Sequence, residues 1–488
     1  MKLPDSGRYE IDKTLSDMKR SDLGERFAEL HRELQKTDKS MLVIIEGWES
    51  SGKGFLLKDL TRELDTRKYE VAVFEETDTH DAGYPYLRRF MKYAPKNGQI
   101  MFFDRSFYYD LMSEHQWDTT PEEFDHLVED IQFIEHALRD DDTLIVKFFL
   151  QQTEEEMHDN IEKLKDDPYR HVRLSDRDHY QLKHYDSFKE HFEEIMKETN
   201  DVPWRILYAD GKKDQSREAL QICIDELEYF LVADEVDTEV ELAALPENDA
   251  LPLSQLDLSK SIDEAKYDDL LDELQERAGE LLYQTYIENK SVIVVYEGTD
   301  AAGKGGNIRR LTRQMDPRGY DVATVASPDA SELARHYLWR FYRDFPSEGR
   351  MTIFDRSWYG RVLVERVEEL TPVYRWQQAY EEINQMEHNL VHQGILVLKY
   401  LIIIDKDEQL ERFKDRQEDP MKQYKLTDED WRNREEFDDY VDAMNEMVVR
   451  TSTDDAPWLV VSGTDKKYAR ITVLQDFIKR VEAYLKDE

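Results

Sequence analysis

Short apolar segments alternate with amphipathic ones along this chain of 488 residues. In the second half, runs of Val, Ile and Leu are separated by stretches with helical spacing, and residues 267–288 place several leucines on one helical face. Buried strands that alternate with helices are typical of a parallel sheet covered on both faces, which binds ligand at the carboxyl ends of its strands. The pattern predicts strands at 292–297, 320–325, 351–355, 395–403 and 458–462.

The first half of the chain repeats this pattern. The segment 41–54 matches 292–305, so that Gly47 stands 251 residues before Gly298. The tripeptide Asp-Arg-Ser follows an apolar run in both halves at the same offset. We therefore predict a tandem duplication of one α/β domain. The expected organisation is a first copy over 1–231, an acidic linker over 232–257 and a second copy over 258–488.

A glycine-rich turn with the spacing G-x-x-x-x-G-K follows the strand predicted at 292–297, and a helix is predicted after it, at 308–315. Strand, glycine turn and helix together predict a phosphate cradle, in which backbone N–H groups and the helix N-terminus face the anion. Lys304 is expected to reach the same anion as a cation. The other residues expected to bind phosphate here are Gly303, Gly305, Gly306 and Asn307.

Two aspartates are candidate magnesium ligands. Asp355 ends an apolar strand, where a carboxylate beside a phosphate loop can hold Mg²⁺. Most such loops supply a Ser or Thr hydroxyl after the lysine, but here that position is Gly305. Asp300, inside the loop, is the expected substitute. Each aspartate also has a purely structural interpretation, because Asp caps helices and is common in turns.

Cations lie around these motifs, as neutralisation of a transferring phosphoryl group requires. Arg356 and Arg361 surround the predicted strand end, and Arg310 follows the loop on a helix. The stretch 412–434 is also rich in Lys and Arg. Two interpretations of that stretch are equally open: a lid that closes over phosphates, or a charged helical hairpin on the surface.

Composition narrows the possible partners and the compartment. The formal net charge of −42 disfavours nucleic acid and anionic membranes as partners. The single cysteine, Cys223, fits a reducing compartment, and the N-terminus lacks the apolar stretch of a signal peptide. No apolar run approaches the roughly 20 residues that span a bilayer. We therefore expect a cytoplasmic protein.

In combination, the motifs of the second half resemble the polyphosphate kinase 2 family. The resemblance spans nearly all of 258–488, and the duplicated architecture is similar to the subgroup with two fused domains. It implies two tandem P-loop kinase-like domains, each a mainly parallel sheet flanked by helices, with a helical lid. It also implies a phosphotransferase that moves the terminal phosphoryl group of inorganic polyphosphate to AMP, giving ADP, with Mg²⁺, and that forms homo-oligomers. The segments that carry it are Glu-Gly-Thr-Asp-Ala-Ala-Gly-Lys-Gly at 297–305, Phe-Asp-Arg-Ser-Trp-Tyr at 354–359, Arg-Val-Leu-Val-Glu-Arg-Val at 361–367, and the run from Asp419 to Arg434.

The resemblance implies a role for each matching residue. Asp300 and Asp355 would organise Mg²⁺, and Lys304 and Arg356 would clamp phosphates. Gly360 departs from the family, which often has a polar residue there. The remaining assignments are Arg361 to phosphate, Arg310 and Glu365 to the nucleotide, and Lys422, Lys425, Arg432 and Arg434 to the lid.

The first copy departs further from this set. It keeps Lys53, Asp104 and Arg105, but Glu49 stands where Asp300 stands and Asp110 stands where Arg361 stands. A carboxylate in place of an arginine reverses the sign of a charge that must neutralise phosphate. We expect the first copy to be catalytically weak or inactive.

Two other functions fit the same motifs. An ATP-dependent nucleoside-monophosphate kinase would share the loop and the lid. A non-catalytic phosphate-binding scaffold would be favoured if both loops were degenerate, and the second loop is complete.

Overall fold

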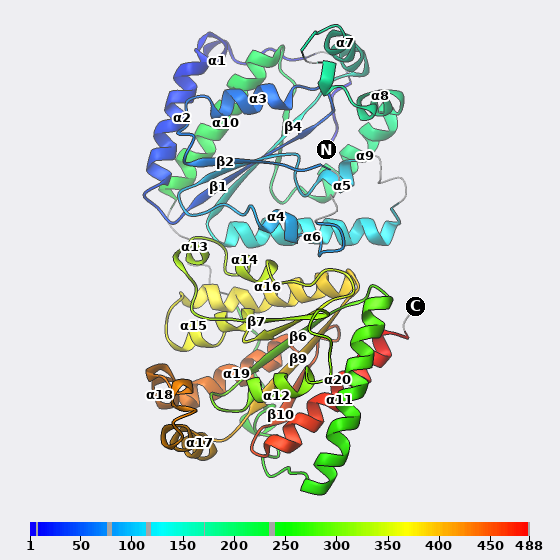
Figure 1. Ribbon diagram of the computed structural model, residues 1–488. Helices are drawn as coiled ribbons and strands as arrows, with labels where there is room; N and C mark the ends of the chain where they lie inside the picture. The colour runs from blue at the N-terminus through cyan, green and yellow to red at the C-terminus, as the bar shows by residue number, and fades with distance from the viewer. Residues whose placement is uncertain (6–7, 76–80, 114–118, 170, 234–239, 487–488) are drawn as a thin grey trace. The chain divides into compact units, whose positions relative to one another are not determined.

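The computed structural model describes residues 1–5, 8–75, 81–113, 119–169, 171–233 and 240–486. They form two compact units (Figure 1). Unit 1 comprises 1–82, 89–236 and 328–339, and unit 2 comprises 83–88, 237–327 and 340–488. Each unit therefore takes in a short segment from the other half of the sequence. Of the linker predicted at 232–257, residues 234–239 lie outside the described residues.

Unit 2 is built on a five-stranded sheet in the order β7-β8-β6-β9-β10. Every pairing is parallel, as the alternating pattern predicts. The first strand of the unit lies at the centre, so the chain leaves it on one side and returns on the other. Its carboxyl end is thus the switch point at which such sheets bind ligands. The strands are β6 (Ser291–Gly298), β7 (Tyr320–Thr324), β8 (Met351–Asp355), β9 (Ile395–Ile403) and β10 (Trp458–Ser462).

Helices cover both faces of this sheet (Figure 1). On one face, Leu281 of α11 and Phe477 of α20 pack with alternate residues of β6 and β9 in one apolar cluster. Successive side chains of a strand point to opposite faces of the sheet. The β-branched residues of β6 are buried on both faces, because helices cover each of them. The longer helices are α11 (Glu264–Ile287), α12 (Lys304–Leu311), α16 (Val373–His392), α17 (Lys406–Glu418), α18 (Asp428–Glu435), α19 (Phe437–Thr451) and α20 (Lys466–Tyr484); the shorter ones are η3 (Asn248–Ala250), η4 (Trp358–Arg361), α15 (Val364–Val367) and η5 (Gln423–Lys425).

Unit 1 repeats the topology, with the sheet order β2-β3-β1-β4-β5 and parallel pairings throughout. The tandem α/β fold predicted from the sequence is confirmed. Its strands are β1 (Ser40–Gly47), β2 (Tyr69–Val73), β3 (Ile100–Asp104), β4 (Thr143–Leu150) and β5 (Trp204–Leu207). The helices of the first half are α1 (Lys13–Asp17), α2 (Arg20–Leu34), α3 (Lys53–Thr61), α4 (Arg88–Met91), α5 (Tyr109–Met112), α6 (Pro121–Asp140), α7 (Glu154–Lys165), η2 (His171–Arg173), α8 (Asp176–Lys183), α9 (Tyr185–Glu198) and α10 (Lys212–Val232), and α13 (Ala330–Leu333) and α14 (Trp339–Tyr342) come from the second half.

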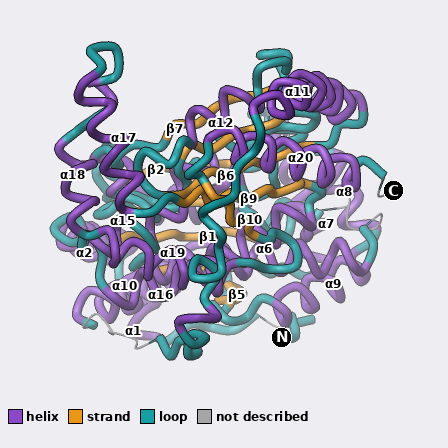
Figure 2. Tube along the Cα trace, turned by 90° about the horizontal axis from the view of Figure 1, so that it is seen from below, coloured by secondary structure: helices purple, strands orange, loops and turns teal. Residues whose placement is uncertain are grey.

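The cationic stretch 412–434 forms a helical hairpin made of α17, η5 and α18, which extends from the rest of unit 2 (Figure 2). Thr427 caps α18, and the side chain of Asp430 accepts a hydrogen bond from the Thr427 backbone N–H. The hairpin is therefore an ordered element. Within the described residues, no helix is both long enough and apolar enough to cross a membrane.

Candidate active site

Glycines let the phosphate loop turn sharply at the end of β6. Gly298 has a φ of +139°, and a Cβ there would lie 2.0 Å from the carbonyl oxygen of Ile402 on β9. Gly303 adopts a φ of +108° as the N-cap of α12, which begins at Lys304. A side chain at Gly298 would collide with backbone, so the loop motif is a steric requirement of the sheet as well as a chemical one.

Lys304 and Arg356 come together beside Asp300. The Lys304 ammonium donates to the carbonyl oxygen of Gly298 at 2.6 Å, which folds its side chain back over the loop. Arg356 Nη2 donates to Asp300 Oδ1 at 3.2 Å. Burial lowers the pKa of Lys304 in spite of the Asp300 charge, whereas for Arg356 the neighbouring carboxylates outweigh burial and raise the pKa. The two predicted cations thus lie at one carboxylate.

Asp355 ends β8, and its carboxylate lies near Gly305 in the first turn of α12. In the sheet it pairs with Tyr296 of β6, two residues before the loop begins. A Cβ built at Gly305 would lie 4.0 Å from Asp355 Oδ2. Since position 305 is where most such loops carry a hydroxyl, the carboxylate of Asp355 faces the place of the missing metal ligand.

A buried glutamate that the sequence analysis overlooked joins the loop to the segment after β8. Glu297 accepts hydrogen bonds from the backbone N–H and the hydroxyl of Ser357, at 2.8 and 2.9 Å. Burial raises its pKa. Its counterpart Glu46 accepts from Ser106 in unit 1 at 2.8 Å. The repeat of a glutamate at the end of an otherwise apolar strand was the available signal.

A cavity of about 70 Å³ opens at this edge of the sheet, beside Asp300 and Arg356. Its remaining wall comes from several later elements. The hairpin contributes polar groups, and Asn433 Nδ2 donates to Asp300 Oδ2 at 2.9 Å. Phe437 and Met444 lie outside the sequence motifs, whereas Leu363, Glu429 and Asn433 lie within them but were given no role at the site. The wall includes Gly360, Leu363, Glu429, Asn433, Phe437 and Met444.

Arg412 holds the loop in place. Its guanidinium donates to the carbonyl oxygens of Ala301 and Ala302, at 2.9 and 3.1 Å, and to those of Gly463 and Thr464, at 2.8 and 2.9 Å. The residue is buried. This arginine of the cationic stretch therefore contacts the outside of the loop rather than its phosphate-facing side.

The other predicted cations of the hairpin make local contacts. Lys422 pairs with Asp419 at 2.7 Å, and Arg432 pairs with Glu368 at 3.0 Å. Arg434 donates to Gln409 Oε1 at 3.2 Å and to the carbonyl oxygen of Lys406. The side chain of Lys425 lies outside the part of the structure that is described.

Four further predicted residues make contacts of their own. Arg361 and Glu365 form an ion pair with each other at 2.9 Å. Asn307 is buried beneath the loop, where its side-chain oxygen accepts from the hydroxyl of Tyr296 at 3.3 Å. Arg310 lies on α12 and donates to the carbonyl oxygen of Gly306 at 3.4 Å. The structure thus brings Asp300, Lys304 and Arg356 together, with the Asp355 carboxylate near Gly305, while the other four residues contact different partners.

The equivalent site of unit 1 is smaller and filled by its own side chains. Glu49 forms ion pairs with Arg105 at 3.1 Å and with Lys53 at 3.7 Å. Tyr109, at the position of Gly360, contacts Arg177 through its hydroxyl and its ring. The cavity here measures about 20 Å³. The longer Glu49 side chain thus satisfies both cations internally.

The fold and this site define a class of protein. A parallel sheet, a glycine loop that ends in lysine at a helix N-terminus, and an Asp-Arg pair at the neighbouring strand end are the parts of a P-loop phosphotransferase. The family model described as polyphosphate kinase 2 (PPK2) matches residues 10–235 and, a second time, residues 261–488. The chain belongs to the polyphosphate kinase 2 family, as the sequence motifs predict.

Individual relatives match over the full length. A protein named polyphosphate:AMP phosphotransferase from Pseudomonas aeruginosa is 35% identical over 98% of both chains. Another of that name, from Pseudomonas syringae pv. tomato, is 34% identical over 93% of both. A crystal structure of a polyphosphate kinase 2 from Pseudomonas aeruginosa is similar with a TM-score of 0.85, 33% identity and 98% coverage of both chains.

Proposed function

We propose that this chain transfers the terminal phosphoryl group of inorganic polyphosphate to AMP, and that unit 2 carries out the reaction. The observation that carries the proposal is the contrast between the two sites. Asp300 and Arg356 border an open cavity in unit 2, whereas Glu49 and Tyr109 narrow the equivalent place in unit 1. The full-length match to two proteins named polyphosphate:AMP phosphotransferase supports the choice of donor and acceptor.

The reaction needs positioning and charge neutralisation more than covalent catalysis. A phosphate oxygen of AMP attacks the terminal phosphorus of the donor, and the bond from that phosphorus to the bridging oxygen breaks. The products are ADP and a polyphosphate one unit shorter, which keeps the electron pair of the broken bond. Lys304 and Arg356 stabilise the charge on the transferring group, and the backbone N–H groups of Gly303, Gly305 and Gly306 bind its oxygens.

The donor atoms at the loop fit a magnesium ion. Asp355 and Asp300 offer hard carboxylate oxygens, which Mg²⁺ prefers, and Asp355 faces the position of the missing hydroxyl. When bound, Mg²⁺ supplies further neutralisation of the phosphate charge. Asp300 is already oriented by Arg356 and Asn433, so its second role is to hold Arg356 toward the cavity.

We propose that the helical hairpin serves as the lid, because Glu429 and Asn433 of α18 border the cavity. In this proposal Lys422, Lys425, Arg432 and Arg434 exchange their local partners for donor phosphates when the hairpin closes. Arg361 is assigned to phosphate as well, and Glu365 and Arg310 to the nucleotide. Homo-oligomer formation and a cytoplasmic location stay predictions from the sequence.

A donor assay tests the reaction. The purified full chain is incubated with Mg²⁺ and AMP, with polyphosphate or ATP offered separately, and ADP is measured by chromatography. We expect ADP with polyphosphate. If ADP forms from AMP only when ATP is the donor, the protein is instead an ATP-dependent nucleoside-monophosphate kinase. If ADP forms with neither donor, a phosphate-binding scaffold is favoured.

Matched variants test which unit is active. Lys304→Ala and Asp355→Asn should each lower kcat by about a hundredfold or more, because the first removes a cation that neutralises the transferring group and the second removes a carboxylate that would hold Mg²⁺. The controls are the equivalent changes in unit 1, Lys53→Ala and Asp104→Asn, for which we expect less than about a threefold change. Equal losses in both units would refute an inactive first copy.

A further inference from the structure

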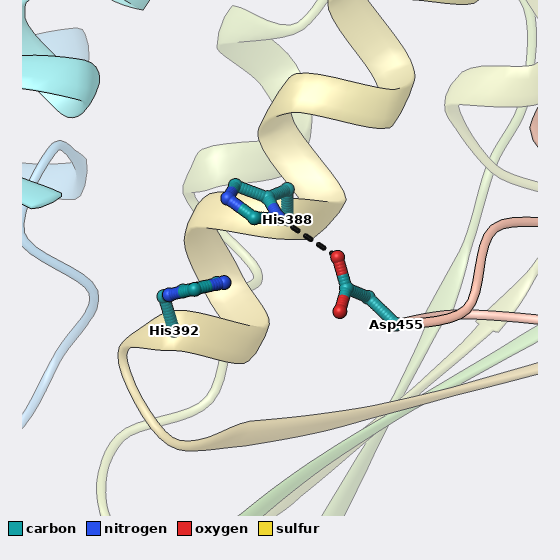
Figure 3. Close-up of side chains that lie close together, drawn as sticks. All are labelled: His388, His392 and Asp455. Carbon is teal, nitrogen blue, oxygen red and sulfur yellow. Dashed lines mark hydrogen bonds and ion pairs between the residues drawn. The ribbon is translucent and has the colours of Figure 1, made fainter.

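Three side chains with metal-binding atoms converge near the end of α16 (Figure 3). His388 and His392 lie one turn apart on this helix, and Asp455 lies in the segment that precedes β10. His388 Nδ1 is 2.7 Å from Asp455 Oδ2, and the two imidazole centroids are 3.9 Å apart. One donor atom from each residue lies within 4.8 Å of the other two. The cluster is separate from the cavity at Asp300, which other residues line.

Local structure fixes this convergence. Residues four apart on a helix share a face, so both imidazoles point the same way. Asn384, one turn earlier on α16, donates to the carbonyl oxygen of Arg450 at 2.9 Å. The segment with Asp455 is ordered by its own hydrogen bond, from Ala456 N to Thr453 Oγ1 at 3.1 Å. The side chains of His388 and Asp455 are each about one-third exposed, at 33% and 35%, so an ion can reach them from solvent.

Unit 1 provides an internal comparison. His136 of α6 is paired with Asp201 at 3.3 Å, in the positions that His388 and Asp455 occupy in unit 2. The residue in the place of His392 is Asp140. A simple contact between the two side chains accounts for the histidine and aspartate that both units share. It does not account for a second imidazole, which only unit 2 adds at the spacing that a shared ion requires.

We propose that His388, His392 and Asp455 bind one divalent first-row transition metal ion, with Zn²⁺ as the best match. Imidazole and carboxylate suit Zn²⁺, whereas Mg²⁺ prefers oxygen ligands only. Zinc lies about 2.0–2.2 Å from such ligands, so two ligand atoms of one tetrahedral ion are about 3.3–3.6 Å apart. Donor atoms that now lie within 4.8 Å of one another need to close by up to about 1.5 Å, and rotation of the exposed His392 side chain can bring its imidazole in. Three protein ligands leave the fourth tetrahedral position to water.

The ion would tie α16 to the segment before β10 and so stabilise unit 2. Glu387, beside His388, is buried on the inner face of α16. Its carboxylate accepts from Trp358 Nε1 at 3.0 Å and from the Tyr359 hydroxyl at 2.8 Å, in the turn that follows Arg356. A metal on the outer face would hold this end of the helix in place. Its role is structural, because the ligands do not adjoin the cavity.

Metal titration of the full chain tests the site. The protein is treated with chelator, dialysed into excess Mg²⁺ without polyphosphate, and titrated with Zn²⁺ by calorimetry. We expect one equivalent that is lost in His392→Ala and in Asp455→Asn and retained in the matched control His136→Ala. At a hundredfold excess over Kd, Zn²⁺ should raise the Tm of the wild type by roughly 5–10 °C, and should leave the Tm of His392→Ala unchanged.

The same data can overturn the proposal. If the wild type binds no equivalent of Zn²⁺, or if His392→Ala binds it as tightly as the wild type, the site does not exist. Loss of the equivalent in His136→Ala would place the ion elsewhere. Because His392 is exposed, its replacement should leave the metal-free Tm as it is, and that measurement shows that the variant is folded.

Discussion

Arg412 is the residue whose removal best tests how the phosphate loop is held. Its guanidinium joins Ala301 and Ala302 of the loop to Gly463 and Thr464 after β10 through four hydrogen bonds. These oxygens are main-chain acceptors that meet at one buried side chain. Arg412→Ala removes every donor of this set at once and leaves the loop without its outer support.

The expected loss can be worked out from these bonds. A hydrogen bond to a charged group contributes roughly 1.5–3 kcal/mol, but burial of the guanidinium opposes that gain and water reaches part of the space left behind. We therefore expect Arg412→Ala to lower the free energy of unfolding by about 3–5 kcal/mol, the usual cost of breaking a buried charged network. A loop displaced by about 1 Å should also lower kcat by about a hundredfold.

Urea unfolding and ADP formation measure the two effects. Arg412→Lys should lie between the wild type and Arg412→Ala, because an ammonium reaches fewer of the four oxygens. Lys414→Ala removes an exposed cation from the same helix and is the control for stability, with an expected change of less than about 1 kcal/mol. If Arg412→Ala unfolds at the same urea concentration as the wild type, the bracing role is wrong.

Three further predictions follow from buried groups and from loop glycines. Glu387→Gln should destabilise unit 2 by about 3–5 kcal/mol in urea unfolding, because it leaves the buried ammonium of Lys399, now 2.6 Å from a carboxylate oxygen, without a counter-charge. Burial raises the pKa of Glu46 from 4.5 to about 7, so the folded state keeps a proton that the unfolded chain loses, and the stability contributed by this group falls as pH rises through that window. The free energy of unfolding of the wild type, measured from urea midpoints, should therefore fall by up to about 3 kcal/mol between pH 5 and 7, and Glu46→Gln should remove this fall. The same dependence of unfolding free energy on pH in both proteins would contradict the assignment. Gly298→Ala should prevent unit 2 from folding, as judged by circular dichroism, because its Cβ would meet backbone at 2.0 Å, whereas Gly54→Ala, with open space around it, should be tolerated.

The hydrophobic pattern predicted the sheet well because strands buried on both faces have nearly continuous runs of apolar, often β-branched, residues. In unit 2 the expected strands agree with β6 to β10 to within one residue at each end. The duplication was equally visible, since the repeat offset aligns whole motifs. The sequence does not decide whether the cationic stretch is a lid or a surface hairpin, because charge spacing alone does not show which side faces a cavity. Its helices, caps and contacts with Asp300 come from the structure.

The sequence by itself determined the family, the fold of each unit and the residues adjacent in the motifs, because those depend on local spacing along one strand and one turn. Only the tertiary structure decided which residues from other elements contact these motif residues. Arg412 is a brace rather than a phosphate ligand because α17 passes behind the loop. Glu297 and Asn433 join the site because the end of β6 and α18 meet there. The first phosphate loop is also complete as a motif, yet Glu49 and Tyr109 leave it a cavity of only about 20 Å³, because of how side chains pack in three dimensions.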